Sequence, residues 1–185
     1  RMESPNEFPN YYIKKLKSKK PSALTLFENP FKGLEDVHKE VITYKREDGI
    51  ELSGTLYLPL GYDETKKEKV PLIMWAYPVE YKDKTTASQN TQNANQFTYP
   101  YYGSPVYWVT KGYAVLDDAA FPIIGEEDEE PNDSFRKQLV ANAEAGIKAV
   151  DELGYIDKSR VAIGGHSYGA FMVANLLSHS DLFAA

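Results

Sequence analysis

From residue 70 onward, apolar runs of strand length alternate with segments that have helical spacing. The expected strands are Val70–Tyr77, Tyr113–Leu116 and Val161–Gly165, and the expected helices run from Ser104 toward Gly112, from Asp133 to Gly154 and from Tyr168 to about Ser178. Parallel strands need crossover connections of this kind. The order therefore predicts an α/β fold in which flanking helices cover a mostly parallel sheet.

An antiparallel hairpin is expected to begin this sheet. Val41–Arg46 and Glu51–Leu58 are alternating runs joined across Asp48-Gly49, which is a strong hairpin signal. Thr85–Gln96 is rich in Asn and Gln and poor in apolar residues, so it predicts a long solvent-facing loop.

Residues 1–40 have a different character. The first twenty residues carry six basic and two acidic side chains, and Tyr11–Leu16 and Ala23–Phe27 have the pattern of two short strands around a turn. A lone hairpin is marginal in water. We therefore expect residues 1–40 to be the end of a larger structure with its linker, and residues 41–185 to form a second domain. A basic arm that orders by lying on the domain is the alternative.

Composition and charge exclude several classes of function. A net charge of −6 argues against a nucleic acid partner, and no apolar run is long enough to span a membrane. Because the chain has no cysteine, it has no disulfide scaffold, thiol nucleophile or thiolate zinc site. Three scattered histidines do not make a metal site, so we predict neither a metal nor a cofactor.

The junction between the last expected strand and helix carries the chemistry. Gly165-His166-Ser167-Tyr168-Gly169 matches the nucleophile-elbow pattern G-x-S-x-G at the carboxyl end of a strand, where open α/β sheets bind ligands. We expect Ser167 to adopt a strained backbone conformation, with Gly165 and Gly169 facing each other where a side chain would collide. Ser167 is therefore the predicted nucleophile, and a glycine-rich packing turn is the alternative.

An elbow serine also needs donors for the oxyanion that develops during acyl transfer. The backbone N–H of Tyr168, directly after the serine, is one expected donor. A second is expected from the segment after the Val70 strand, where Tyr77 carries a phenol. Spacing alone leaves it equally open whether Tyr77 is a donor or merely a core or belt aromatic.

None of the three histidines qualifies as the base that the serine needs. His166 is next to Ser167, and neighbours on a tight turn point apart. His179 would lie about 18 Å along the helix from Ser167, and His38 precedes the sheet. In hydrolases with this elbow the acid and then the histidine follow the serine, and sixteen residues follow Gly169. We therefore expect a fragment that stops before its acid and base and is nearly inert alone.

The elbow and two other segments resemble one family of enzymes. Residues 164–172, Gly-Gly-His-Ser-Tyr-Gly-Ala-Phe-Met, resemble the elbow of prolyl oligopeptidase-family serine peptidases, in the branch that includes glutamyl endopeptidases and dipeptidyl peptidase-like proteins. Trp75-Ala76-Tyr77-Pro78 sits where that family carries its oxyanion tyrosine. Asp117–Pro122 and the acidic stretch Gly125–Asp133 are also similar to that branch.

The resemblance extends over residues 41–185 and implies an α/β-hydrolase fold, a peptide substrate and an acyl-enzyme formed on Ser167. It favours Tyr77 as an oxyanion donor and places the Tyr168 ring beside the pocket for the residue before the scissile bond. It further implies that Tyr11–Leu26 is the last strand or two of a β-propeller, and that the catalytic Asp and His lie after residue 185. The sequence contains neither the propeller body nor that pair.

Two other functions stay open. An esterase or acyltransferase on the same scaffold would differ in its leaving group, and a binding or assembly module could keep the serine without the catalytic pair. Similarity to glutamyl-specific relatives suggests acidic side chains before the cut, and such a pocket needs a cation. Lys82, Lys84 and Arg136 are basic and near candidate cleft loops, but surface lysines are too common to single them out.

Two surface features complete the expectations. The carboxylates of residues 126–130 predict a solvated loop rather than a binding site. A sheet that ends with the Val161 strand would leave an unprotected edge, which invites pairing between chains.

Overall fold

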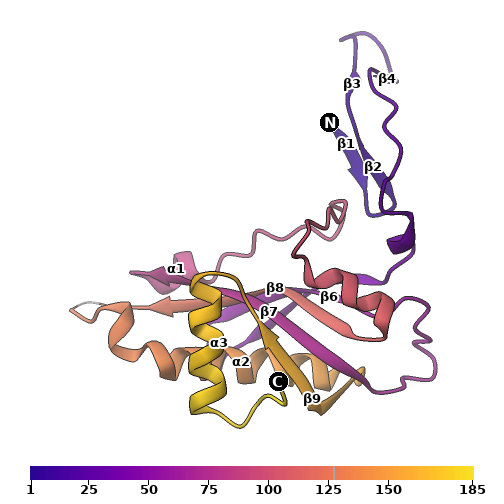
Figure 1. Ribbon diagram of the computed structural model, residues 1–185. Helices are drawn as coiled ribbons and strands as arrows, with labels where there is room; N and C mark the ends of the chain where they lie inside the picture. Colours follow the sequence, from indigo (N-terminus) through magenta and orange to yellow (C-terminus); the bar gives the residue numbers. More distant parts are fainter. Residues whose placement is uncertain (127) are drawn as a thin grey trace.

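The computed structural model describes residues 1–126 and 128–185, and its centre is a five-stranded sheet (Figure 1). The strands are β5 (Lys39–Lys45), β6 (Glu51–Tyr57), β7 (Val70–Tyr81), β8 (Ala114–Ile124) and β9 (Ile156–Gly164). In space their order is β5-β6-β8-β7-β9. The pairs β5–β6 and β6–β8 are antiparallel, whereas β7 is parallel to both β8 and β9. The predicted sheet, with its hairpin at one edge, is confirmed.

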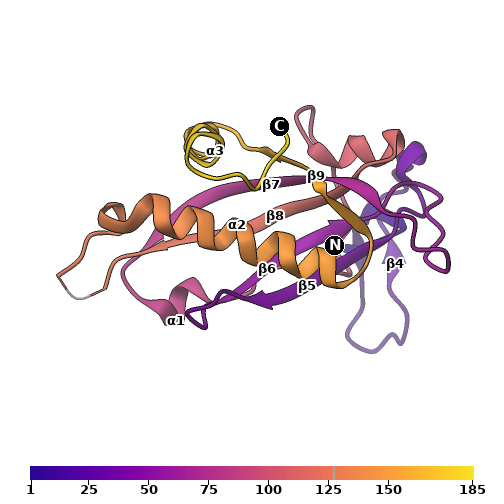
Figure 2. The ribbon, with the colours of Figure 1, turned by 90° about the horizontal axis from the view of Figure 1, so that it is seen from below.

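Three helical segments cover the two faces of this sheet. They are the 3-10 helix η2 (Pro105–Lys111) and the α-helices α2 (Phe135–Glu152) and α3 (Tyr168–His179). The chain moves from β7 to its neighbour β8, and then returns across β7 to reach β9. Since right-handed crossovers in opposite directions leave on opposite faces, η2 lies on one face and α2 on the other. Figure 2 shows α2 and α3 together on the same side of the strands.

The hydrophobic core divides along the same two faces. Under α2 and α3, the side chains of Met74 and Leu116 lie against Gly146 of α2, in a cluster that also holds Met172 and Leu176. Under η2, Val106 and Val109 pack with Val115 and with the partly buried Ile73. Met74 and Ile73 are neighbours in β7, and Leu116 and Val115 are neighbours in β8. The core therefore follows the alternation of side chains in strands that are covered on both faces.

A buried arginine ties the β5–β6 hairpin to α2. Arg46 is 5% exposed and donates two hydrogen bonds to Asp48, at 2.8 and 2.6 Å. It also donates to Asn142 of α2 at 2.9 Å, and the Asn142 amide donates to the carbonyl of Pro122 in β8. The hairpin turn contains Gly49 at a φ of +86°, as its Asp-Gly sequence predicts. The turn, α2 and the far end of β8 thus share one polar network.

Several elements differ from the expected bounds. The strand expected to end at Tyr77 continues to Tyr81, and the one expected over Val161–Gly165 begins at Ile156. The segment after Ser104 is a 3-10 helix that ends at Gly112, where φ is +85°. Its run of β-branched and aromatic residues disfavours a regular α-helix.

Two short helices also depart from the prediction. The loop expected over residues 85–96 overlaps a short helix, α1 (Lys84–Ala87), which the side chain of Asp83 caps. Asp133 does not cap α2. It closes a capping box with Glu130 on the 3-10 helix η3 (Pro131–Ser134), and α2 starts after it.

Residues 1–38 form an arm that stands away from the sheet, and Lys39 and Glu40 already belong to β5 (Figure 1). The arm has two small antiparallel pairs, β1 (Met2–Ser4) with β2 (Glu7–Asn10) and β3 (Tyr12–Ile13) with β4 (Ser22–Ala23), followed by the 3-10 helix η1 (Lys32–Leu34). The β3–β4 hairpin lies inside the predicted one but is much shorter, and the β1–β2 pair was not expected. Ile13, Leu16, Leu24 and Leu26 are 55–104% exposed. That this arm is the end of a propeller stays a prediction.

The last residues of the chain lie along the free edge of β9. The N–H of Ala184 donates to the carbonyl of Val161 at 2.8 Å, and the N–H of Ile163 donates to the carbonyl of Ala185 at 3.0 Å. The edge that we expected to be unprotected is therefore partly covered, and self-association through it stays a prediction. No helix among the described residues is long and apolar enough to cross a membrane.

The Arg46 network yields the first prediction. Replacing Arg46 with Met should lower the free energy of unfolding by about 3 kcal/mol, because the buried amide oxygen of Asn142 would lose its donor. Urea denaturation would measure this change. Lys45→Met, at the exposed neighbouring position, is the control and should change stability by less than about 0.5 kcal/mol. Equal effects of the two substitutions would contradict a structural role for the network.

Candidate functional site

Ser167 lies at the sharp turn between β9 and α3. Its backbone has φ +56° and ψ −115°, which is a strained conformation for a residue with a side chain, and the residue is exposed. The strained turn that the elbow pattern predicted is therefore present. The hydroxyl belongs to a rigid strand–helix junction and is open to solvent.

Two glycines allow the backbone to make this turn. A Cβ added to Gly165 would lie 2.8 Å from both the Cα and the carbonyl carbon of Gly169, and 2.8 Å from the carbonyl oxygen of Ala76. A Cβ added to Gly169 would lie 2.7 Å from the same oxygen. Real Cβ atoms do not approach backbone this closely. Both positions therefore require glycine, and together they allow the elbow to contact β7 at Ala76.

This contact brings Tyr77 next to the serine turn. In the parallel β7–β9 pair Trp75 is opposite Gly164, so β7 continues as Ala76 and Tyr77 beside the elbow. Tyr77 is 51% exposed, and its ring meets that of Tyr168 edge to face, with centroids 6.1 Å apart. A core role for Tyr77, the alternative that the sequence left open, does not fit this exposure.

The backbone N–H of Tyr168 is available for a ligand. The N–H groups of Gly169, Ala170 and Phe171 donate to carbonyls of residues 166 and 167. Among the described residues, the N–H of Tyr168 has no such backbone partner. Since the first N–H groups of a helix lack intrahelical acceptors, this donor can serve an anion at the serine turn.

The Tyr168 side chain is held in an aromatic cluster. Its ring stacks on Phe135 of α2, with centroids 5.6 Å apart, and on Phe171 of α3 at 6.0 Å. Its hydroxyl donates a hydrogen bond of 2.9 Å to the carboxylate of Glu80 in β7. Burial, together with the hydrogen bond to Glu80 and its charge, raises the pKa of the Tyr168 phenol to about 12. Sequence reasoning missed Glu80, because its bond to Tyr168 joins residues 88 positions apart.

The histidines have partners elsewhere or lie exposed. His38 contacts Glu64, with Nδ1 2.9 Å from a carboxylate oxygen. His179 lies 2.9 Å from Arg136 and 2.9 Å from the carbonyl of Asn175. Across residues 1–126 and 128–185, no hydrogen bond joins a side chain to the Ser167 hydroxyl. The described residues therefore bring together Ser167, Tyr168 and Tyr77, but they bring no base to the serine.

The basic residues near the site pair with the acidic loop or with His179. Lys82 contacts Glu130, and Lys84 contacts Glu126, both at 2.6 Å. Part of the predicted carboxylate run, Glu127, lies outside the described residues. These ion pairs fit a solvated surface loop. They also mean that both lysines already have a carboxylate partner within this chain.

Asp117 and Asp118 interrupt β8, which is separated by β7 from β9, the strand that leads into the elbow. The strand was expected to end at Asp117-Asp118, but it continues through a bulge in which Asp118 has φ +50° and its N–H donates to the Asp117 carboxylate at 3.0 Å. Gln92 donates to the Asp118 carbonyl at 2.7 Å. Burial raises the pKa of the Asp117 carboxyl to about 6.

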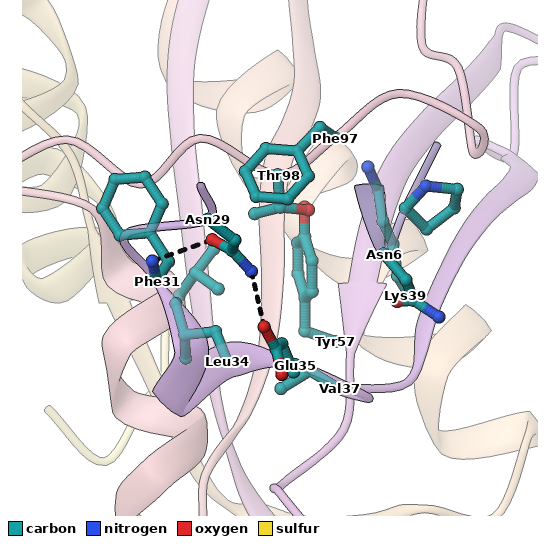
Figure 3. A pocket seen from close by; sticks show the side chains of 12 residues that line it. Asn6, Asn29, Phe31, Leu34, Glu35, Val37, Lys39, Tyr57, Phe97 and Thr98 are labelled. Carbon is teal, nitrogen blue, oxygen red and sulfur yellow. Dashed lines mark hydrogen bonds between the residues drawn. The ribbon is translucent and has the colours of Figure 1, made fainter. Parts of the chain in front are cut away.

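A small pocket of about 30 Å³ lies away from the elbow, between the arm, its linker and the 97–98 loop (Figure 3). In it Asn29 donates to Glu35 at 3.0 Å and accepts from the N–H of Phe31 at 2.8 Å. Neither Ser167 nor either candidate tyrosine lines this pocket. In the described part of the chain, no group of three or more His, Asp or Glu side chains is placed to hold a metal ion.

Comparisons with known proteins agree on one family. Residues 133–185 match the model of the prolyl oligopeptidase family. The chain is 44% identical over 183 residues to a probable chloroplastic glutamyl endopeptidase of Arabidopsis thaliana, and 43% identical over 178 residues to one of Oryza sativa subsp. japonica. These matches cover 98% and 96% of the chain but 19% of each relative. The chain therefore spans about a fifth of the length of these curated relatives.

Solved structures show the same fold. The apo AtxE2 isopeptidase matches 99% of this chain with 28% of its own, at a TM-score of 0.66 and 24% identity. An acylaminoacyl peptidase of Pyrococcus horikoshii matches 98% of this chain with 27% of its own, at a TM-score of 0.62 and 21% identity. At these identities the likeness concerns the α/β-hydrolase fold alone.

The elbow glycines generate a prediction. Gly165→Ala and Gly169→Ala should each displace the turn, because the new methyl group would collide with backbone on both sides. We expect a loss of stability of about 2 kcal/mol or more, together with loss of the Ser167 geometry. Thermal denaturation and the crystal structures of the variants would check both effects. Gly33→Ala is the control, since a Cβ there meets no atom within 4 Å. A wild-type melting temperature for either elbow variant would contradict the predicted collision.

Asp117 generates a prediction about pH. Its pKa is raised from 3.8 to about 6 in the folded chain, so over this range the native state holds a proton that the unfolded chain has released. Wild-type stability should therefore fall as the pH rises from about 4 to 6, and Asp117→Asn should abolish this loss. We expect the variant to be more stable by up to about 2 kcal/mol at pH 7 and to lose that advantage by pH 4. Asp181→Asn, at an exposed position, is the control, and a gain that is independent of pH would refute the assignment.

Proposed function

Because the chain belongs to the prolyl oligopeptidase family of peptidases, we propose that it is part of a serine peptidase catalytic domain in which Ser167 is the nucleophile. The observation that carries this proposal is the exposed, strained Ser167 at the end of β9. A hydroxyl held on a strand–helix turn is positioned for attack because the backbone, rather than a flexible loop, determines where it points.

In the proposed reaction, the Ser167 oxygen attacks the carbonyl carbon of a peptide bond. Its proton passes to a base and then to the leaving amine, and an ester between Ser167 and the acyl part of the substrate remains. Water then attacks that ester and releases the acid and free Ser167. The Tyr168 N–H and the Tyr77 hydroxyl are the proposed donors to the oxyanion of each tetrahedral intermediate.

The base and its orienting acid are proposed to come from a part of the polypeptide that is not present in these 185 residues. The partners of His38 and His179, and the lack of a contact to the Ser167 hydroxyl among the described residues, support this view. The elbow order of serine, acid and histidine also supports it. The segment alone should then retain binding and oxyanion contributions but almost no turnover.

Residues 1–40 are proposed to be the end of a β-propeller and its linker, joined to the catalytic domain at residue 41. The arm exposes Ile13, Leu16, Leu24 and Leu26, and such apolar side chains on short strands call for neighbouring strands to cover them. Contacts between the arm and the catalytic domain include Phe8 against Phe97, with centroids 5.3 Å apart. The alternative of a basic arm that only lies on the domain leaves most of its apolar side chains uncovered.

The proposed substrates are peptides. The two plant relatives are named as probable glutamyl endopeptidases, which suggests a preference for an acidic residue before the scissile bond. Such a preference requires a cation in the pocket. Because Lys82 and Lys84 are paired with Glu130 and Glu126, that cation is expected from Arg136, which contacts His179, or from another part of the polypeptide.

Labelling of the serine tests this function. A fluorophosphonate should label the full-length polypeptide at Ser167 rapidly and this 185-residue segment slowly, because the segment lacks a base. Mass spectrometry of the labelled peptide would identify the site, and Ser167→Ala should abolish labelling. Rapid labelling of the segment would show that a base lies within it, and labelling at another serine would refute the proposal.

The Tyr77 hydroxyl can be tested separately. Tyr77→Phe in the full-length polypeptide should lower kcat by roughly 10²- to 10³-fold with little change in KM, since an oxyanion donor acts in the transition state. Steady-state kinetics on a peptide substrate would measure this. Tyr81→Phe, further along the same strand, is the control. A wild-type kcat for Tyr77→Phe would exclude the hydroxyl from the oxyanion site.

A further inference from the structure

Glu80 differs from the carboxylates that follow β8. Glu126 and Glu130 each form an ion pair with a lysine. Among the described residues, Glu80 forms no ion pair, and its side chain instead accepts a 2.9 Å hydrogen bond from the Tyr168 hydroxyl. Glu80 thus bonds a neutral phenol rather than a cation. The phenol belongs to the residue that directly follows Ser167.

The position of Glu80 in β7 explains how it reaches this phenol. β7 contacts the elbow at Ala76 and then continues to Tyr81, paired with β8 as far as Ile124. Glu80 therefore stands on a strand whose pairing with β8 continues past it. A strand held in this way is a firmer support than a loop for a group that must direct a neighbouring side chain.

The aromatic contacts of Tyr168 do not fix the position of the ring tip, whereas the hydrogen bond to Glu80 does. Phe135 and Phe171 stack near parallel to the Tyr168 ring, at 20° and 13°, and Tyr77 meets it edge to face. Aromatic pairs are favourable over a range of offsets and centroid distances, so these contacts alone do not fix the tip of the ring. A hydrogen bond from the phenol to a charged acceptor depends on both distance and direction. It therefore determines where the tip of the ring lies.

We propose that Glu80 is a positioning residue for substrate: it holds the Tyr168 ring as a wall of the pocket beside Ser167. The proposal rests on the function proposed above. Glu80 accepts the hydrogen bond of the phenol and thereby determines where the tip of the Tyr168 ring lies relative to Ser167. Without Glu80, Ser167 and its oxyanion donors stay in place, but the Tyr168 ring, which orients a peptide, can move.

A double-mutant cycle in the full-length polypeptide tests this role. Glu80→Ala should lower kcat/KM for a peptide roughly tenfold, the usual effect of one charge-assisted hydrogen bond, and mainly by raising KM. Glu80→Gln keeps an acceptor for the phenol and should stay within about threefold of the wild type. In a Tyr168→Phe background, Glu80→Ala should cause no further loss. Glu144→Ala, at an exposed position of α2, is the control.

The rate of phosphonate labelling separates positioning from damage to the nucleophile. A small fluorophosphonate does not use the pocket wall, so Glu80→Ala should be labelled at the wild-type rate although its KM for a peptide is raised. An unchanged KM, or an equal loss in the wild-type and Tyr168→Phe backgrounds, would overturn the role of Glu80. Failure of the wild type to label at Ser167 would instead overturn the proposed function.

A spectroscopic measurement tests the contact without any catalysis. With 3-fluorotyrosine incorporated at position 168, the fluorine resonance should shift in Glu80→Ala and stay in place in Glu144→Ala. Glu80→Gln should give an intermediate shift, because it keeps the acceptor and loses the charge. A resonance that is the same with and without Glu80 would overturn the proposal whether or not the protein is active.

Discussion

At the end of β9 the backbone of the elbow lies directly on the carbonyl oxygen of Ala76, and the rest of the site depends on that contact. Gly165 and Gly169 both approach the oxygen so closely that neither can carry a side chain. The close approach forces the turn at Ser167 into its strained conformation. It also sets the distance between the serine turn and Tyr77, the next residue of β7. Nucleophile and candidate oxyanion donor are thus placed by a single backbone contact.

The strand order explains why this contact forms where the carboxyl ends of the parallel strands are open. The chain leaves β7 toward η2 on one face and leaves β9 through α3 on the other, so the carboxyl ends of these neighbouring strands open between diverging connections. Open α/β sheets bind ligands at such a point. Apolar packing of α2 and α3 then supplies Phe135 and Phe171 as supports for the Tyr168 ring.

The parts of the fold that follow from local chemistry could be predicted from the sequence. Apolar runs covered on both faces, the Asp48-Gly49 turn and the elbow glycines each require one backbone geometry, and the structure has it. Longer-range effects could not be predicted. The Asp117-Asp118 pair resembles the end of a strand, but pairing with β7 carries β8 onward through a bulge. The bond from Tyr168 to Glu80 joins residues 88 positions apart, and no local pattern records it.

The unequal lengths of β7 and β9 have a consequence for how a substrate can arrive. β9 ends at Gly164, opposite Trp75, whereas β7 continues to Tyr81, about 20 Å further at the usual rise of a strand. β7 therefore extends past the end of β9 beside the serine. Access to Ser167 is therefore limited on the side where β7 continues past the elbow.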